Sequence, residues 1–335
     1  MAILTISPFP HPDLKLQRFR IVISAGANGL LLPPYPGSTL RGAFGHALRE
    51  MSCTAGKGQD CNGCFYQMIC PVTMLFNPVV PEEQEGLFAK GQEIPTPFVL
   101  RPLTDGRTMY QPGETFEVEI TIFGKSIPFA PYLLSALSRA LEKGIGKGLK
   151  SSSIISAYLF NPFTNDRHAI FEKGQWNLTN KVNLSAYDVD ARVNKLLYSS
   201  VNKGSQTYKV TFNSPLRLKA DKHFQNKLTA PLLIRGLMRR LSVITAYYGE
   251  QQWSIDFYKY IELANSLQVR EEKYEWVDWE RYSSRQNSKM KLGGIMGSLV
   301  LEGEALKELL PLLIWGQLIH LGKAASFGLG ALEIE

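Results

Sequence analysis

The sequence has no hydrophobic segment of the kind that exports a protein or holds it in a membrane. Residues 1–13 contain neither a basic start nor an apolar core, and two prolines fall within the first ten positions, which argues against a signal peptide. The longest apolar stretch, 309–321, is interrupted by a proline and two polar residues and is shorter than the ~20 residues that a membrane span needs. These absences predict a soluble, cytoplasmic protein with no membrane partner.

Cysteine is also scarce, with four among 335 residues, yet all four lie in one short segment. A secreted, disulfide-bonded protein would scatter its cysteines, whereas a cytosolic chain that clusters them usually binds a metal. The spacing Cys53-x7-Cys61-x2-Cys64-x5-Cys70 predicts a structural zinc ion held by four thiolates. An iron–sulfur cluster is the second choice, because the same ligands serve it, and four unliganded thiols are the remaining alternative. Four protein ligands leave no open position, so such a metal would not be catalytic.

Net charge is modest, because 37 Lys and Arg stand against 30 Asp and Glu to give +7. This total identifies no partner, but the charges are segregated along the chain. Basic residues dominate 215–240 and 281–291, while acidic residues concentrate in 82–93 and 271–280. A charge run is usually only a solvated surface. Two basic runs in one half of the chain favour nucleic-acid binding, with Arg239, Arg281 and Arg285 as candidate contacts.

The length predicts two domains, since domains usually run to ~100–200 residues. The order β-α-β-β-α-β recurs in 1–160 and 206–335. We therefore predict an α+β protein of two tandem ferredoxin-like (RRM-like) domains, with a four-cysteine insert at 52–76 and an insertion or linker at 161–205. The expected strands are 19–24, 98–102, 115–123, 153–160, 207–213, 275–282, 297–302 and 331–334, and the expected helices are 39–51, 131–143, 230–248, 254–266 and 311–321, the last with Pro311 in its first turn.

The predicted helix 39–51, capped by Ser38 or Thr39, has two different faces. Helical spacing predicts a buried face made of Leu40, Ala43, Phe44, Ala47, Leu48 and Met51. On the other side Gly42, His46 and Arg49 share a surface, with Gly45 beside them. Glycines in a helix cost ~1 kcal/mol each relative to alanine, which close approach of a ligand would justify. A histidine beside an arginine is placed to touch a phosphate, and an ordinary surface histidine is the alternative.

Two glycine-rich loops follow predicted helices, at 144–148 and 322–330. Each precedes a predicted strand, whereas a Walker phosphate loop runs from strand to helix and is excluded. The small residues and cations suggest contact with a sugar-phosphate backbone, and Phe327 is available for stacking. A tight turn is the alternative. The candidate contacts in these loops are Lys147, Lys323, Ser326, Gly328 and Gly330.

The chain resembles the CRISPR-associated endoribonucleases that process precursor CRISPR RNA, the Cas-six family of the repeat-associated mysterious protein (RAMP) superfamily. The matching stretches are residues 38–48 (Ser-Thr-Leu-Arg-Gly-Ala-Phe-Gly-His-Ala-Leu), the cysteine insert ending Cys70-Pro71 with Leu75-Phe76, 97–100 (Pro-Phe-Val-Leu), 279–283 (Trp-Glu-Arg-Tyr-Ser) with Gly293, Gly294 and Gly297, and 320–330 (His-Leu-Gly-Lys-Ala-Ala-Ser-Phe-Gly-Leu-Gly). They span almost the whole chain except 161–205. The family has two ferredoxin-like domains and a glycine-rich loop near the C-terminus, in agreement with the pattern above.

The resemblance implies metal-independent cleavage of CRISPR repeat RNA, in which a ribose 2′-OH attacks the adjacent phosphate to leave a 2′,3′-cyclic phosphate and a 5′-OH. His46 matches the family's first-helix histidine and is the expected general acid–base. Tyr35 could assist, and Arg49, Arg41 or Lys57 could stabilise the developing charge, with Arg41 also a candidate RNA contact. No lysine within the helix accompanies His46, unlike in some family members.

The implied partners are repeat RNA, its crRNA product and CRISPR effector subunits. Two other functions stay open. One is a non-catalytic RNA-binding RAMP subunit of an effector complex, since fold alone does not separate it from a nuclease. The other is a zinc-stabilised adaptor that binds protein.

Overall fold

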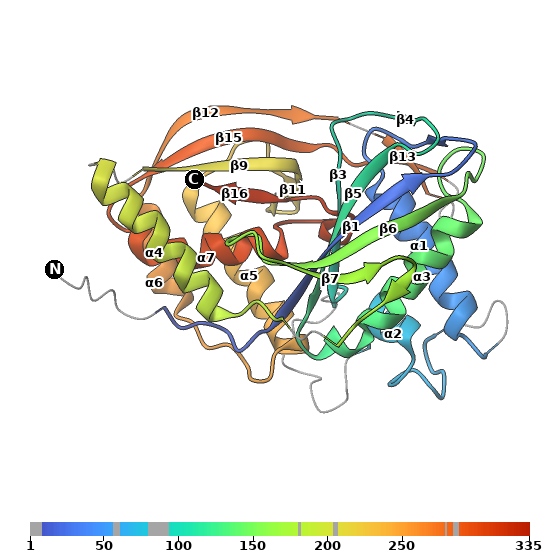
Figure 1. Cartoon of the computed structure of the whole chain (residues 1–335). Coiled ribbons are helices and arrows are strands. Elements are labelled where there is room, and N and C mark those ends of the chain that lie inside the picture. The colour runs from blue at the N-terminus through green and yellow to red at the C-terminus, as the bar shows by residue number, and fades with distance from the viewer. Residues whose placement is uncertain are drawn as a thin grey trace. The chain divides into compact units, whose positions relative to one another are not determined.

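The computed structural model describes residues 9–55, 61–79, 94–179, 182–203, 207–278, 280–283 and 288–335. Helices and antiparallel strands form two compact units, each with its own main sheet (Figure 1). The N-terminal unit consists of Lys15–Leu184 and Tyr247–Glu250, and the C-terminal unit of Met1–Leu14, Ser185–Ala246 and Gln251–Glu335. The predicted α+β class is confirmed.

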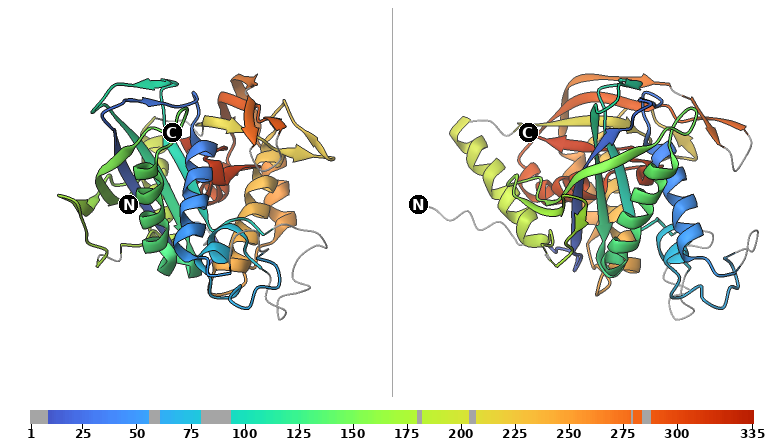
Figure 2. Two further views of the ribbon diagram at one scale, coloured as in Figure 1. Left: turned by 90° about the vertical axis from the view of Figure 1, so that its right-hand side faces the viewer. Right: turned by 45° about the vertical axis from the view of Figure 1, so that its right-hand side comes forward.

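The N-terminal unit is an antiparallel sheet covered by helices. Its elements are β1 (Leu16–Ala25), β2 (Leu30–Leu31), α1 (Gly37–Ser52), α2 (Pro71–Phe76), β3 (Phe98–Leu103), β4 (Met109–Tyr110), β5 (Thr115–Phe123), the 3-10 helix η2 (Gly124–Phe129), α3 (Ala130–Lys143), β6 (Ser152–Phe160), β7 (Arg167–Glu172) and β8 (Gln175–Trp176). The strand order is β3-β5-β1-β6-β7-β8. Phe19, Ile21 and Ile23 of β1 are buried on one face, because alternate side chains of a strand point the same way. They join one core with α1 and α3, which lie side by side (Figure 2).

The other face of this sheet carries a buried ion cluster around Glu119 of β5. Its carboxylate accepts hydrogen bonds from Arg18 and Arg20 of β1, and Nη1 of Arg101 lies 3.8 Å from its Oε2. Burial alone would raise the pKa of Glu119, but the charges of Arg18 and Arg101 and the hydrogen bonds from Arg18 and Arg20 lower the pKa from 4.5 to about 2. Glu119 is therefore ionised throughout the ordinary pH range.

The C-terminal unit repeats the same strand order. Its elements are α4 (Ala186–Lys203), β9 (Thr207–Leu216), β10 (Lys219–Ala220), β11 (His223–Phe224), α5 (Ala230–Tyr248), α6 (Phe257–Asn265), β12 (Gln268–Val277), β13 (Glu280–Ser283), β14 (Ser288–Lys291), β15 (Gly294–Glu302), α7 (Leu306–Ile319), the 3-10 helix η3 (Ala325–Phe327) and β16 (Leu332–Ile334). The sheet order β12-β15-β9-β16 matches β3-β5-β1-β6, and all of these pairs are antiparallel. Helices α5 and α7 lie on one face of the sheet (Figure 1).

Helix α7 is the most deeply buried helix segment of this unit that the structure describes. Eleven of its 14 residues are buried, including Trp315 at its centre, as expected for a helix that is apolar on every side. No helix among the described residues is long and apolar enough to cross a membrane.

The segment that precedes β1 is anchored to the C-terminal unit through His11. Nε1 of Trp315 donates a hydrogen bond to Nδ1 of His11 at 3.1 Å, and Nε2 of His11 lies 2.9 Å from Oδ1 of Asp190. Because Nδ1 accepts, the proton of a neutral His11 belongs on Nε2, where it is donated to the carboxylate. Nε1 of Trp253 also donates to the carbonyl oxygen of Pro10.

The predicted order β-α-β-β-α-β is present in both units, but several local expectations are wrong. Within the part of the chain that the structure describes, no side chain caps α1, which begins at Gly37 after Pro36. The strand expected at 275–282 is divided between β12, which begins earlier and ends at Val277, and β13. Helix α7 begins at Leu306, so Pro311 lies inside the helix, because residues 306–310 are good helix formers. Residues 161–205 contain β7, β8 and α4, and their interpretation as an insertion or linker stays a prediction.

Candidate functional site

Helix α1 has the buried and exposed faces that its sequence predicts. Leu40, Phe44 and Leu48 are completely buried, whereas His46 and Gly42 are exposed. Phe44 packs against Phe76 of α2 with ring centroids 4.8 Å apart. Of the predicted apolar face, only Met51 is exposed, near the C-terminal end of the helix. The core therefore fixes α1 in an orientation that directs His46 to solvent.

Packing explains the presence of only one of the two glycines in this helix. A Cβ at Gly45 would lie 2.9 Å from Cε1 of Phe76, so Gly45 allows α2 to pack closely on α1. A Cβ at Gly42 would meet no other described atom within 4 Å. Packing within the described chain thus accounts for Gly45 and leaves the ~1 kcal/mol cost of Gly42 unexplained. The surface at Gly42, one helical turn before His46, is open to a ligand.

The structure adds a lysine to this helix from a distant part of the sequence. Nζ of Lys143, the last residue of α3, forms an ion pair with Glu50 of α1. The hydrogen bond from Lys143 lowers the pKa of Glu50, and the charges of Lys143, Arg139 and His46 act in the same direction. Glu50 is one turn after His46, so α3 contributes positive charge beside the exposed face of α1. Sequence reasoning missed this pair because α1 and α3 are packed neighbours only in the fold.

The other residues predicted around His46 belong to the same N-terminal unit. Tyr35 is half-buried in the turn before α1, and Arg49 is half-buried on the helix. The guanidinium of Arg41 lies over the ring of Phe76, 4.8 Å from its centroid. Lys147 is exposed in the loop after α3, with its backbone N–H donated to the carbonyl oxygen of Leu31 at 3.0 Å. Lys57 lies outside the described residues.

The four cysteines are half-buried and form no disulfide. Cys53 directly follows α1, Cys61 and Cys64 lie in one turn, and Cys70 directly precedes α2. In the described ranges, no three His, Cys, Asp or Glu side chains come close enough together to hold a metal ion. The zinc site therefore stays a prediction from the cysteine spacing.

The C-terminal glycine-rich loop is pinned to the end of β9. The N–H of Gly330 is donated to the carbonyl oxygen of Pro215, and that of Lys323 to Arg217. A Cβ at Gly330, whose φ is +68°, would lie 1.7 Å from the carbonyl oxygen of Leu321. Gly328 and Gly330 are buried and shape the loop, whereas Lys323 is exposed and Ser326 half-exposed. Lys323 and Ser326 therefore have side chains that a ligand can reach, and Phe327 beside them is also half-exposed.

The basic run 215–240 contains both structural and exposed cations. Nη1 of buried Arg217 donates to the carbonyl oxygen of Gly293 at 2.9 Å. Nε of Arg240 donates to that of Ile319 at 2.9 Å, and burial lowers the pKa of Arg240 to about 10. Arg239 is exposed on α5. Arg281 lies in β13 without a described side chain, and Arg285 falls outside the described residues.

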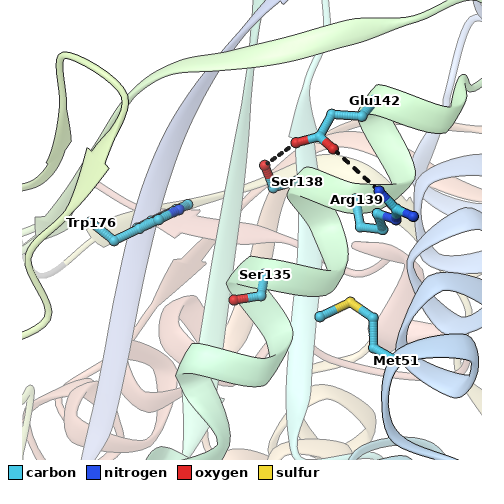
Figure 3. Close-up of a pocket in the computed structure, with 6 residues that line it drawn as sticks. All are labelled: Met51, Ser135, Ser138, Arg139, Glu142 and Trp176. Carbon is cyan, nitrogen blue, oxygen red and sulfur yellow. Dashed lines mark hydrogen bonds and ion pairs between the residues drawn. The ribbon is translucent and has the colours of Figure 1, made fainter.

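A shallow cavity of about 450 Å³ lies between α1, α3 and β8 of the N-terminal unit (Figure 3). Trp176 of β8 and Met51 of α1 flank helix α3, where Glu142 accepts a hydrogen bond from Ser138 at 3.3 Å. Arg139 lies 3.9 Å from the same carboxylate. The lining is completed by Ser135. None of these six residues is among the sites that the sequence predicts.

Two family models together match most of the chain. Residues 14–183 match the AF_1859_N family, an N-terminal domain, and residues 210–332 match the family of the CRISPR-associated endoribonuclease Cas6. An uncharacterized protein of Archaeoglobus fulgidus is 25% identical over 313 residues, which make up 91% of this chain and 93% of the relative.

Solved structures share the fold at low sequence identity. A chain of a partial Cas6-RT-Cas1–Cas2 complex matches 98% of this chain with a TM-score of 0.59 and 14% identity. The match covers 47% of that longer chain, so this chain spans about half its length. Thermus thermophilus Cas6 matches 96% of this chain over 99% of its own length, with a TM-score of 0.52 and 14% identity. A Cas6 product complex gives a TM-score of 0.53, also at 14% identity.

Proposed function

The chain belongs to the Cas6 family of CRISPR-associated endoribonucleases, and from this membership we propose that it cleaves CRISPR repeat RNA to make mature crRNA. The observation that carries the assignment of the site is the exposed face of α1. There His46 shares the surface with Gly42, a glycine that no packing within the described chain requires.

The proposed reaction needs no water and no attacking group from outside the RNA. The 2′-oxygen of one ribose forms a bond to the adjacent phosphorus, and the bond from phosphorus to the 5′-oxygen of the next nucleotide breaks. One product ends in a 2′,3′-cyclic phosphate and the other begins with a 5′-OH. The nucleophile is tethered beside its target, so proximity supplies much of the acceleration. The protein then has to move two protons and stabilise negative charge on the phosphate oxygens.

His46 is the proposed acid–base group, because imidazole both accepts and donates protons near neutral pH. The open surface at Gly42 lets a ribose-phosphate backbone approach α1 within reach of the imidazole. Arg49, one turn along the helix from His46, is the proposed partner for the charge that develops on the phosphate. Tyr35, in the turn before α1, is the proposed assistant in positioning the RNA.

Exposed cations on both units are the proposed RNA contacts away from the cut. In the N-terminal unit they include Lys147, and in the C-terminal unit Arg239 and Lys323, with Ser326 beside the latter. Such contacts to phosphate position an RNA without reading its sequence. Their proposed role predicts affinity that falls steeply with salt concentration.

The test compares His46→Ala with His168→Ala, which removes an exposed histidine from β7 of the same unit. Cleavage of repeat RNA is measured in EDTA under single-turnover conditions, with RNA affinity measured separately. We expect His46→Ala to be at least ~10²-fold slower with its affinity retained, and His168→Ala to match wild type. Unchanged cutting by His46→Ala would remove His46 from the site. Wild-type protein that binds repeat RNA tightly but never cuts it would instead favour a non-catalytic RNA-binding subunit.

A further inference from the structure

Two half-exposed aromatic rings meet on the surface of the C-terminal unit. Phe224 of β11 is 37% exposed and Trp276 of β12 is 36% exposed, and their ring centroids lie 6.5 Å apart. Trp276 is near the end of an edge strand whose other exposed residues are mainly charged. A tryptophan in that setting leaves a large apolar surface in water, which is typical of a binding site.

A rigid hairpin presents Phe224. Strands β10 and β11 pair across a tight turn, in which Asp221 and Lys222 both have positive φ, at +49° and +67°. This conformation is typical of the type I′ turn that joins two short strands. Gln225 fixes the far end of the hairpin, since its backbone N–H is donated to the carbonyl oxygen of Leu218 at 2.9 Å. The ring is therefore held in place before any ligand binds, which lowers the entropic cost of binding.

Asp278 holds Trp276 in position, and Gly293 leaves room for the pair. Nε1 of the indole donates a hydrogen bond to Oδ1 of Asp278 at 2.8 Å. A Cβ at Gly293 would lie 2.8 Å from that nitrogen and 2.2 Å from Oδ1 of Asp278, so the pair fits only against a glycine. The carbonyl oxygen of the same glycine accepts the hydrogen bond from Arg217. Gly293 thus contributes to the placement of both the indole and the arginine beside Phe224.

Two cations lie against the ring of Phe224. The guanidinium of Arg217 and Nζ of Lys219 lie 4.4 Å and 4.7 Å from the centroid of Phe224. Lys323 of the glycine-rich loop follows directly, because its backbone N–H is donated to the carbonyl oxygen of Arg217 at 2.9 Å. The loop proposed above to contact phosphate is therefore adjacent to the arginine that packs on Phe224. Aromatic rings next to exposed lysines match the chemistry of a nucleotide, which offers a π-face and a negative charge.

We propose that Phe224 and Trp276 form an aromatic platform on which an unpaired base of the RNA stacks, while Lys219 and Lys323 contact its phosphates. The proposal rests on the proposed function, because it names how that RNA is held. An unpaired base is the expected occupant, since a base within an A-form duplex has both faces covered and exposes none for stacking. The platform is distinct from His46, which belongs to the other unit.

The test measures the affinity of the full-length protein for repeat RNA that carries a 2′-deoxyribose at the cleavage nucleotide and so cannot be cut. Trp276→Ala should bind at least ~5-fold more weakly, because stacking of one base is worth ~1–3 kcal/mol. Trp276→Phe keeps a stacking ring and should lose less. Tyr258→Ala is the matched control, since it removes a 78% exposed aromatic from α6 of the same unit, and it should bind as wild type does.

A series of RNAs with one abasic nucleotide at each unpaired position identifies the base. Wild-type protein should bind more weakly when the abasic nucleotide is at one or two of these positions. Trp276→Ala should bind those RNAs no more weakly than it binds the intact RNA. Quenching of tryptophan fluorescence by the RNA in wild type, reduced in Trp276→Phe, gives the same answer if the alanine variant does not fold. Equal affinity of Trp276→Ala and wild type, or wild-type binding that is insensitive to every abasic position, would overturn the platform alone. Wild-type protein that binds no repeat RNA would instead overturn the proposed function.

Discussion

Replacing Glu119 by glutamine should destabilise the N-terminal unit strongly at neutral pH and much less in acid. The substitution keeps the shape of the side chain and removes the charge that holds Arg18, Arg20 and Arg101 together. Glu119 is only 3% exposed. Its replacement therefore removes a buried carboxylate from the arginine charges that face it, and breaking a buried ion pair in this way commonly costs ~3–5 kcal/mol.

The pKa of Glu119 gives an independent magnitude. A fall from 4.5 to about 2 corresponds to ~3 kcal/mol of stability at neutral pH, at ~1.4 kcal/mol per pKa unit. Folding lowers the pKa of Glu119, so the full stabilisation is present at a pH above the pKa of the unfolded state. It is lost as the pH falls through 4.5 toward 2. At pH 3 we expect only ~1.4 kcal/mol of it to remain.

The assay unfolds wild type and Glu119→Gln with urea at pH 7 and at pH 3. After return to a common buffer, the hydrogen exchange of the β1 and β5 amides is measured. The matched control is Glu117→Gln on the same strand, because that carboxylate is 41% exposed and lies 3.8 Å from Nε of Arg20. An exposed pair of this kind is worth ~0–1 kcal/mol. The reasoning fails if the two variants are equally stable, or if the gap between wild type and Glu119→Gln is as large at pH 3 as at pH 7.

Three further predictions concern the glycines and the cysteines. Gly330→Ala places a Cβ 1.7 Å from a backbone oxygen and should lower the melting temperature far more than Gly174→Ala. Gly174 has a similar positive φ but no described neighbour within 4 Å. Equal shifts of the melting temperature in calorimetry would contradict this. Gly42→Ala should raise the stability of the N-terminal unit by up to ~1 kcal/mol and slow RNA cleavage, whereas Gly45→Ala should lower stability by forcing a ring of α2 aside. The cysteine spacing predicts that elemental analysis finds about one zinc per chain, which Cys61→Ser should lose. Metal-free protein that chelators leave unaffected would reject the site.

The sequence predicted best what depends on local periodicity. The apolar spacing of α1 identified a helix whose Leu40, Phe44 and Leu48 are buried and whose His46 is exposed, because each burial follows from a 3.6-residue repeat. The order of the strands along the chain was also predictable. The pairing of those strands was not, since register and sheet order depend on contacts between segments that are distant in the sequence.

The clusters missed by sequence reasoning are all assembled by that pairing. Glu119 meets its arginines across three strands, and Lys143 reaches Glu50 only because α3 packs beside α1. Trp276 gave one local signal, as a large aromatic in an otherwise charged strand, but its neighbour Phe224 comes from a separate hairpin. The sequence also left two interpretations of the glycine-rich loop open, and buried Gly330 serves the hydrogen-bonded tight turn that was one of them.

Analysis of the RNA ends tests the central claim most directly. Repeat RNA is incubated with wild-type protein in EDTA, and the mapped products are examined by mass spectrometry, with a second substrate that carries a single 2′-deoxyribose before the scissile phosphate. The account predicts a 5′ fragment that ends in a 2′,3′-cyclic phosphate, lighter by one water than the linear phosphate, a 3′ fragment that begins with 5′-OH, and no cutting of the deoxy substrate. Cleavage of the deoxy substrate, or products with 3′-OH and 5′-phosphate ends, would contradict it.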